Sequence, residues 1–94
     1  MNMSNNTNLG YHIQKIAKGT FGDPSKIVEE TLEFEDAVKQ EVTIMALVEL
    51  ADLYGAIEGY LTKHHPSITI KDLAAMSKVT KRVFENGHRK ATRD

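Results

Sequence analysis

The sequence predicts an all-α protein: a compact helical bundle of three main helices with an N-terminal appendage, completed by oligomerisation. Three observations indicate this fold class. Apolar residues recur at helical spacing in three segments between residues 27 and 86. Helix-start signals precede two of the segments, and no series of alternating residues predicts a sheet. A chain of 94 residues has room for one modest core, which self-association would help to stabilise.

The first 22 residues form the appendage. Residues 1–9 are polar and rich in asparagine, which predicts a weakly ordered tail and no secretory signal. Residues 11–21 fit two structures. Ile13, Ile16 and Ala17 have the spacing of a short helix, but Gly10, Gly19 and Gly22 bracket the segment and equally suit an extended arm.

The first main helix is predicted over residues 27–40, because Asp23-Pro24-Ser25 supplies an N-cap and a first-turn proline. A second helix is predicted from residues 41–43 to about Thr62. The junction between them contains neither glycine nor proline, so a tight turn and a short loop both remain open.

A loop is predicted over residues 63–69, after which Thr69 can cap a third helix from Ile70 to about Asn86. Gly87 stands where a helix C-terminus favours glycine. The expected packed face of this helix consists of Leu73, Met76, Thr80, Val83 and Phe84. The domain division is therefore a tail and arm over 1–22, a helical domain over 23–90, and a short tail over 91–94.

Composition excludes several classes of function. The chain has no cysteine, which excludes disulfides, thiolate metal sites and cysteine nucleophiles. No apolar run approaches the roughly 20 residues that span a bilayer, so we expect no membrane partner and a cytoplasmic location. The net charge of −1 conceals an acidic centre. Residues 23–58 contain ten acids and two lysines, whereas residues 71–94 contain seven bases and three acids.

The acids of the second helix occupy unusual positions. At about 100° per residue, Glu49 lies within the apolar stripe of this helix, and Asp52 follows on the same face at i+3. The stripe consists of Val42, Ala46, Leu53, Ile57 and Tyr60 on one side of Glu49, with Met45 and Ala56 on the other.

The first helix repeats the arrangement. Glu30 borders its apolar stripe, and Glu33 follows at i+3. If the two stripes pack together, Glu30, Glu33, Glu49 and Asp52 converge, and such closeness needs protons or divalent cations to relieve the repulsion. Oxygen-only ligands suit Mg²⁺ or Mn²⁺. The remaining acids of the region are expected on a solvated face: Glu29, Glu35, Asp36 and Glu41.

Together these acids read E-E-x-x-E at Glu29, Glu30 and Glu33, followed after fifteen residues by E-x-x-D at Glu49 and Asp52. This pattern resembles the signature of the all-α nucleoside-triphosphate pyrophosphohydrolases, the MazG-like superfamily. The resemblance covers residues 24–89. It implies Mg²⁺-dependent cleavage between the α- and β-phosphates of a nucleoside triphosphate, giving the monophosphate and pyrophosphate. It also implies a homodimer or homotetramer with sites near subunit contacts.

By the same resemblance, Glu30, Glu33, Glu49 and Asp52 would bind the metal. Glu29 and Glu30 would be the catalytic carboxylates, with Glu29 orienting or deprotonating the attacking water or touching a second metal. The basic end then acquires a role in binding phosphate. Lys78, Arg82 and Asn86 form a ridge at i, i+4 and i+8 of the last helix, and Lys26 precedes the acidic motif, so these four residues are candidate substrate contacts. A solvated flank explains each of them equally well.

Two further features have simpler explanations. His64 and His65 lie in a predicted loop without a third ligand at suitable spacing, which indicates solvent-exposed side chains rather than a metal site. Ala51, Gly55 and Gly59 form a stripe of small residues that permits close packing, and a second subunit is one candidate for the packing partner.

Two other functions compete with hydrolysis. Residues 69–74 followed by 79–83 are similar to the start of a lac-repressor-type helix-turn-helix domain, but the turn position lacks glycine and the apolar spacing continues unbroken. A slightly acidic chain also disfavours a nucleic-acid partner. The second alternative keeps the metal and nucleotide but omits turnover, giving a regulatory protein.

Overall fold

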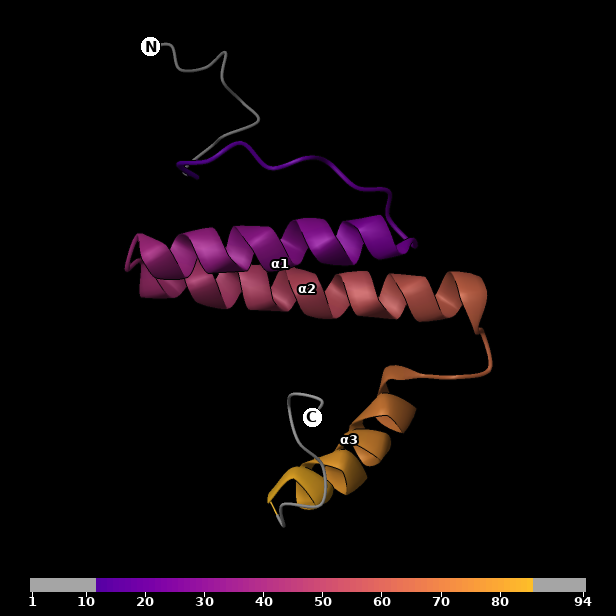
Figure 1. The fold of residues 1–94 in the computed structure, drawn as a ribbon. Helices are drawn as coiled ribbons and strands as arrows, with labels where there is room; N and C mark the ends of the chain where they lie inside the picture. Colours follow the sequence, from indigo (N-terminus) through magenta and orange to yellow (C-terminus); the bar gives the residue numbers. More distant parts are fainter. Residues whose placement is uncertain (1–11, 86–94) are drawn as a thin grey trace, which may run out of the picture.

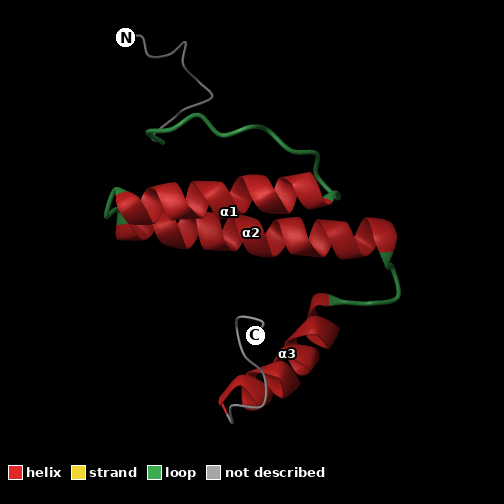
Figure 2. Cartoon of the chain, in the orientation of Figure 1, coloured by secondary structure: helices red, strands yellow, loops and turns green. Residues whose placement is uncertain are grey.

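The computed structural model describes residues 12–85 and confirms the all-α class. Its helices are α1 (Pro24–Lys39), α2 (Thr43–His64) and α3 (Ile70–Glu85), and residues 12–85 contain no strand (Figure 2). Residues 12–22 form an extended arm rather than a helix, which settles the alternative left open by the glycines. The arm runs alongside α1 (Figure 1) and contributes Ile16 to a small core with Ala37, Ala56 and Leu61.

Helices α1 and α2 form an antiparallel hairpin (Figure 1). The junction is a tight turn in which Glu41 has a φ of +61°, and it closes with Schellman-type hydrogen bonds. The Val42 amide donates to the Ala37 carbonyl at 3.2 Å, and the Glu41 amide donates to the Val38 carbonyl at 2.9 Å. Glutamate at a left-handed position costs about 1–2 kcal/mol, so this turn forms without the residue that favours it most.

Asp23 links α1 to α2 at the end of the hairpin opposite the turn. This residue occupies the N-cap position of α1, as predicted, but its side chain makes no cap hydrogen bond. It instead accepts hydrogen bonds from Lys63 at 2.8 Å and His64 at 3.0 Å, at the end of α2. Helix α1 starts at Pro24, directly after the predicted N-cap and three residues before the periodic segment, and α2 continues two residues further than predicted, through His64.

Helix α3 contacts α2 but not α1, and it projects away from the hairpin (Figure 1). The predicted cap is confirmed: the Thr69 hydroxyl oxygen accepts from the Asp72 amide, and Asp72 accepts from the Thr69 amide. The prediction that Met76 and Thr80 belong to a packed face is wrong for a single chain, because both are exposed. The side chains of Val83 and Phe84, and Asn86, Gly87 and both tails, lie outside the described residues.

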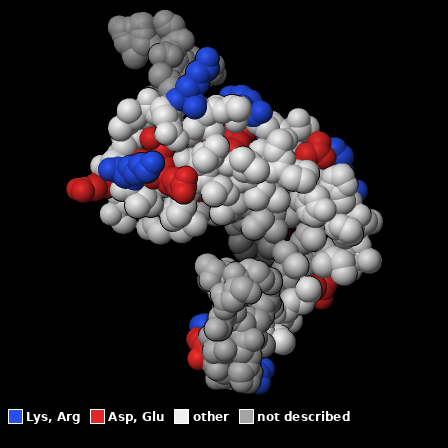
Figure 3. Space-filling model, viewed as in Figure 1, with Lys and Arg blue, Asp and Glu red and all other residues white. Residues whose placement is uncertain are grey.

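A second apolar surface runs along α2 on the side turned away from Glu49. Leu47 is 56 % exposed and Tyr54 53 % exposed, and Ile44 and Leu50 belong to the same surface. Broad areas of the visible molecular surface carry neither acid nor base (Figure 3). Within the described residues, no helix combines the length and the apolar character that crossing a membrane requires.

Candidate metal centre

The hairpin explains why acids that are distant in sequence meet. Glu33 and Glu49 each lie eight residues from Glu41 in the turn, and Glu30 and Asp52 each lie eleven residues from it. Because both helices rise about 1.5 Å per residue from the same turn, each pair lies at the same height along the hairpin. The i+3 spacing within each helix then turns both acids toward the partner helix.

The structure brings all four predicted metal ligands and Glu29 into overlapping clusters. Carboxylate oxygens of Glu30, Glu49 and Asp52 lie within 4.8 Å of one another, which places ligands from both helices around one point. Oxygens of Glu29, Glu30 and Glu33 meet the same limit. Either grouping has the donor type and spacing that a hard divalent cation requires.

Glu30 is one of the two buried residues among the four predicted metal ligands, and its ion pair with Lys26 uses only one of its carboxylate oxygens. Its side chain is 6 % exposed, and Lys26 Nζ lies 3.1 Å from Oε2. Its other oxygen, Oε1, is buried and has no hydrogen-bond partner within the described part of the chain while Glu33 is ionised, whereas protonated Glu33 donates a hydrogen bond to the Glu30 carboxylate. A buried carboxylate oxygen without a partner costs free energy unless a proton or a cation compensates it. The residues present therefore fit a metal ion beside Oε1.

The pKa values of Glu33 and Glu49 are raised above those of ordinary glutamates. Burial raises the pKa of Glu33 to about 7, and the charge of Glu30, a hydrogen bond from protonated Glu33 to the Glu30 carboxylate and the charge of Glu29 add to the rise. Burial also raises the pKa of Glu49, with a contribution from the charge of Asp52. Each of these carboxylates resists ionisation in the metal-free protein, which is the behaviour expected where negative charges converge without a cation.

Glu29 behaves in the opposite way. Burial alone would raise its pKa, but the Gly19 amide and the Lys26 ammonium lower it below its usual value. The Gly19 amide donates to Glu29 Oε1 at 2.8 Å, and Lys26 Nζ donates to the same oxygen at 3.1 Å. Gly19 can approach this closely only because it has no side chain. A Cβ atom at this position would collide with the Ser25 backbone. The prediction that Glu29 lies on a solvated face is wrong, since the arm covers it.

Asp36 is the second correction to the solvated face, whereas Glu35 and Glu41 are exposed as predicted. Asp36 is 3 % exposed, and its Oδ2 accepts hydrogen bonds from His12 Nδ1 at 2.8 Å, the Ile13 amide at 3.1 Å and Gln40 at 2.8 Å. These bonds lower the pKa of Asp36 against the opposing effect of burial. Asp36 therefore fastens the arm to α1.

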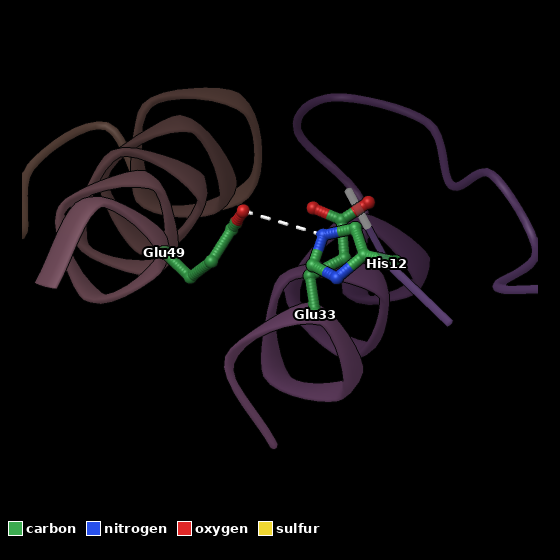
Figure 4. Close-up of side chains that lie close together, drawn as sticks. All are labelled: His12, Glu33 and Glu49. Carbon is green, nitrogen blue, oxygen red and sulfur yellow. Dashed lines mark ion pairs between the residues drawn. The ribbon is translucent and has the colours of Figure 1, made fainter. Parts of the chain in front are cut away.

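His12 is the site residue that sequence reasoning missed. Its Nε2 lies 3.4 Å from Glu49 Oε2, while Nδ1 faces Asp36. Figure 4 shows His12 from the arm, Glu33 from α1 and Glu49 from α2 pointing toward one another. Ligand atoms of these three side chains also lie within 4.8 Å of one another. The sequence feature that could have pointed to this part of the site is Asp36, because it lies three residues after Glu33 and therefore on the same face of α1.

The predicted substrate contacts divide by location. Lys26 lies in the site, between Glu29 and Glu30. Lys78 and Arg82 are exposed on α3, which contacts α2 but not α1. Their role stays a prediction, and Asn86 lies outside the described residues. His64 and His65 are exposed, as predicted.

The raised pKa of Glu33 predicts how stability depends on pH. Between about pH 4.5, its ordinary value, and about pH 7, the folded protein holds a proton on Glu33 that the unfolded chain releases. The free energy of unfolding of the metal-free protein should therefore fall as pH rises through this window. Urea denaturation in EDTA at half-unit pH steps measures it. Glu33→Gln should flatten this part of the profile, and an unchanged profile would contradict the assignment.

Comparison of the chain with protein-family profiles, with curated proteins and with solved structures finds no match.

Proposed function

We propose that the protein is a Mg²⁺-dependent nucleoside-triphosphate pyrophosphohydrolase, which cleaves the α–β phosphoanhydride to give a nucleoside monophosphate and pyrophosphate. One observation carries the proposal. The acids of an E-E-x-x-E and an E-x-x-D motif meet across a helical hairpin, and one of them, Glu30, buries an oxygen without a hydrogen-bond partner in the described residues. The motif also resembles the signature of the MazG-like superfamily, which is the source of the reaction type.

The proposed roles follow from the environment of each residue. Glu30, Glu33, Glu49 and Asp52 would hold the divalent cations, with Mg²⁺ or Mn²⁺ as the fitting ions. Bound there, the ions supply neutralisation of phosphate charge and activation of water. Lys26 is placed to contact phosphate oxygens once cations share the charge of Glu29 and Glu30. Because Glu29 keeps a low pKa, it suits orienting the water by accepting a hydrogen bond better than removing its proton.

Self-association is part of the proposal. The surface of α2 that carries Leu47 and Tyr54 is apolar and exposed, and so is Met76 on α3. A helix that is apolar on both sides is typical of one buried between partners. A homodimer or homotetramer would cover this surface and complete the compact bundle that a single chain lacks. A cytoplasmic location stays a prediction.

A non-catalytic alternative has one observation in its favour. Lys26 Nζ lies 3.1 Å from both Glu29 and Glu30 and already compensates part of their charge, so the site has a cation of its own. A regulatory protein that binds nucleotide without turnover could use this arrangement. A helix-turn-helix protein is not proposed, because α3 continues through residues 76–78 where that motif requires a turn.

A panel of nucleoside triphosphates with Mg²⁺ or Mn²⁺ tests the proposal. The expected products are pyrophosphate and monophosphate in equal amounts, measured separately from free phosphate. Replacing the metal by EDTA should abolish product formation. Nucleotide-induced thermal stabilisation without released pyrophosphate would favour the regulatory alternative. Release of single phosphates would contradict cleavage at the α–β bond.

A further inference from the structure

Two adjoining cavities extend from the carboxylates along α2. The cavity beside the site, of about 380 Å³, is lined by Lys26, Glu30 and Asp52 at one end and by Phe21 and Gly55 at the other. A second cavity, of about 570 Å³, shares Phe21 and Gly55 and continues past Gly59 toward Thr62. The two shared residues make them one groove, with the carboxylates at one end and, at the other, a mainly apolar surface that Glu58 and Lys63 border. Its size is that of a small-molecule site.

The apolar end is built around an exposed aromatic ring. Phe21 is 65 % exposed although it lies against α2. The ring can lie there because position 59 is glycine, since a methyl group on Gly59 would come 2.5 Å from Phe21 Cζ. The prediction that the small-residue stripe permits close packing is therefore met within one chain at Gly59, by the arm rather than by a helix.

Gly55 differs from Gly59. A Cβ atom at Gly55 would have no heavy atom within 4 Å, so this glycine faces the open groove. Glycine inside a helix lowers stability by roughly 0.5–1 kcal/mol relative to alanine. Its effect here is to keep the passage open between the carboxylates and Phe21.

The charged end supplies the independent indication that a ligand enters. Glu30 lines this end and carries the buried Oε1 that has no hydrogen-bond partner among the described residues. A compound that fills the whole groove therefore needs an anionic, metal-binding group at Glu30 and Asp52, together with a flat apolar group in the adjoining cavity.

We infer that the groove between Phe21 and α2 is the nucleobase site, in which the base of the metal-bound nucleotide stacks on the face of Phe21 above Gly55. The inference rests on the proposed function and assigns its base-recognising residues. Stacking on one aromatic face tolerates different bases, so Phe21 contributes affinity. Glu58 and Thr62 line the far end, where polar groups would contact the base edge and set the preference.

Ligands with and without a base provide the test. Calorimetry with Mg²⁺ compares a nucleoside triphosphate with inorganic triphosphate, which has the phosphates alone. Wild type should bind the nucleotide at least about tenfold more tightly. Phe21→Ala removes the ring, and Gly55→Leu fills the open groove without meeting protein atoms at its Cβ. Both variants should lose this preference and keep the affinity for inorganic triphosphate.

Two further variants serve as a second test and a control. Gly59→Ala should reproduce the loss, because its methyl group displaces the Phe21 ring. Ala75→Leu, an equally bulky change on the exposed surface of α3, should change neither affinity. Variants that keep the nucleotide preference, or that weaken both ligands equally, would overturn the inference while leaving pyrophosphate release by wild type intact. A wild type that binds nucleotide through Phe21 but releases no pyrophosphate would overturn only the proposed reaction, and one that binds neither ligand would overturn both.

Discussion

Replacing Glu49 by glutamine should reduce pyrophosphate release by at least about 1,000-fold while leaving the fold at least as stable as wild type. The substitution keeps the shape of a residue that is 4 % exposed and removes a negative charge that the proposed cations would need. Loss of several kcal/mol of metal-derived transition-state stabilisation corresponds to a rate effect of this size. Stability should not fall, because burial and the charge of Asp52 both oppose ionisation of Glu49, and the carbonyl oxygen of glutamine can still accept a hydrogen bond from His12 Nε2.

Glu35→Gln is the matched control, since it makes the same chemical change on the exposed side of α1. It should retain wild-type turnover and a wild-type unfolding midpoint. Activity is measured as pyrophosphate released per minute at saturating Mg²⁺, and stability by thermal unfolding in EDTA at pH 8. Near-wild-type turnover by the Glu49 variant, or its failure to fold, would refute the assignment of Glu49 as a metal ligand.

Replacing Asp36 by alanine should lower the free energy of unfolding by about 3–5 kcal/mol, a large part of the stability of a domain this small. The substitution leaves His12 Nδ1, the Ile13 amide and the Gln40 amide group without their shared acceptor. We expect the arm to detach from α1, which would also uncover Glu29 and withdraw His12 from Glu49. Urea denaturation measures the loss, and limited proteolysis near residues 12–22 measures arm release.

Glu35→Ala, at the neighbouring exposed position, should change stability by less than about 0.5 kcal/mol. A double-mutant cycle with His12→Ala separates the His12–Asp36 pair from the other two bonds. If Asp36→Ala unfolded at the same urea concentration as Glu35→Ala, the arm would have no measurable role in stability.

The sequence was sufficient to predict the helices and the meeting of the acids, because both follow from local spacing. Helical periodicity placed Glu49 within an apolar stripe, and the i+3 partners on each helix then had to share its face. The equal distances from Glu41 complete the explanation, since any tight turn at that position aligns Glu33 with Glu49. None of this requires knowledge of distant contacts.

The remaining features depend on contacts that no local pattern encodes. The apolar residues of the arm have the spacing of a helix that does not form, so the pairing of His12 with Asp36 across 24 residues could not be read from spacing. Glu41 adopts a left-handed conformation that glycine usually provides, so the tight turn had no sequence signal. The position of Phe21 is permitted by the absence of a side chain at Gly59, which gives only an indirect signal.

The exposed apolar surface of α2 would make the stability of the fold depend on the protein concentration. If a second copy covers Leu47 and Tyr54, as proposed, some of the free energy that holds each chain together comes from its neighbour. The folded population then varies with the concentration of the protein, and the midpoint of thermal unfolding rises as the solution becomes more concentrated. Dilution would separate the copies and lower the folded fraction, so the amount of protein synthesised would itself set how much of it is folded.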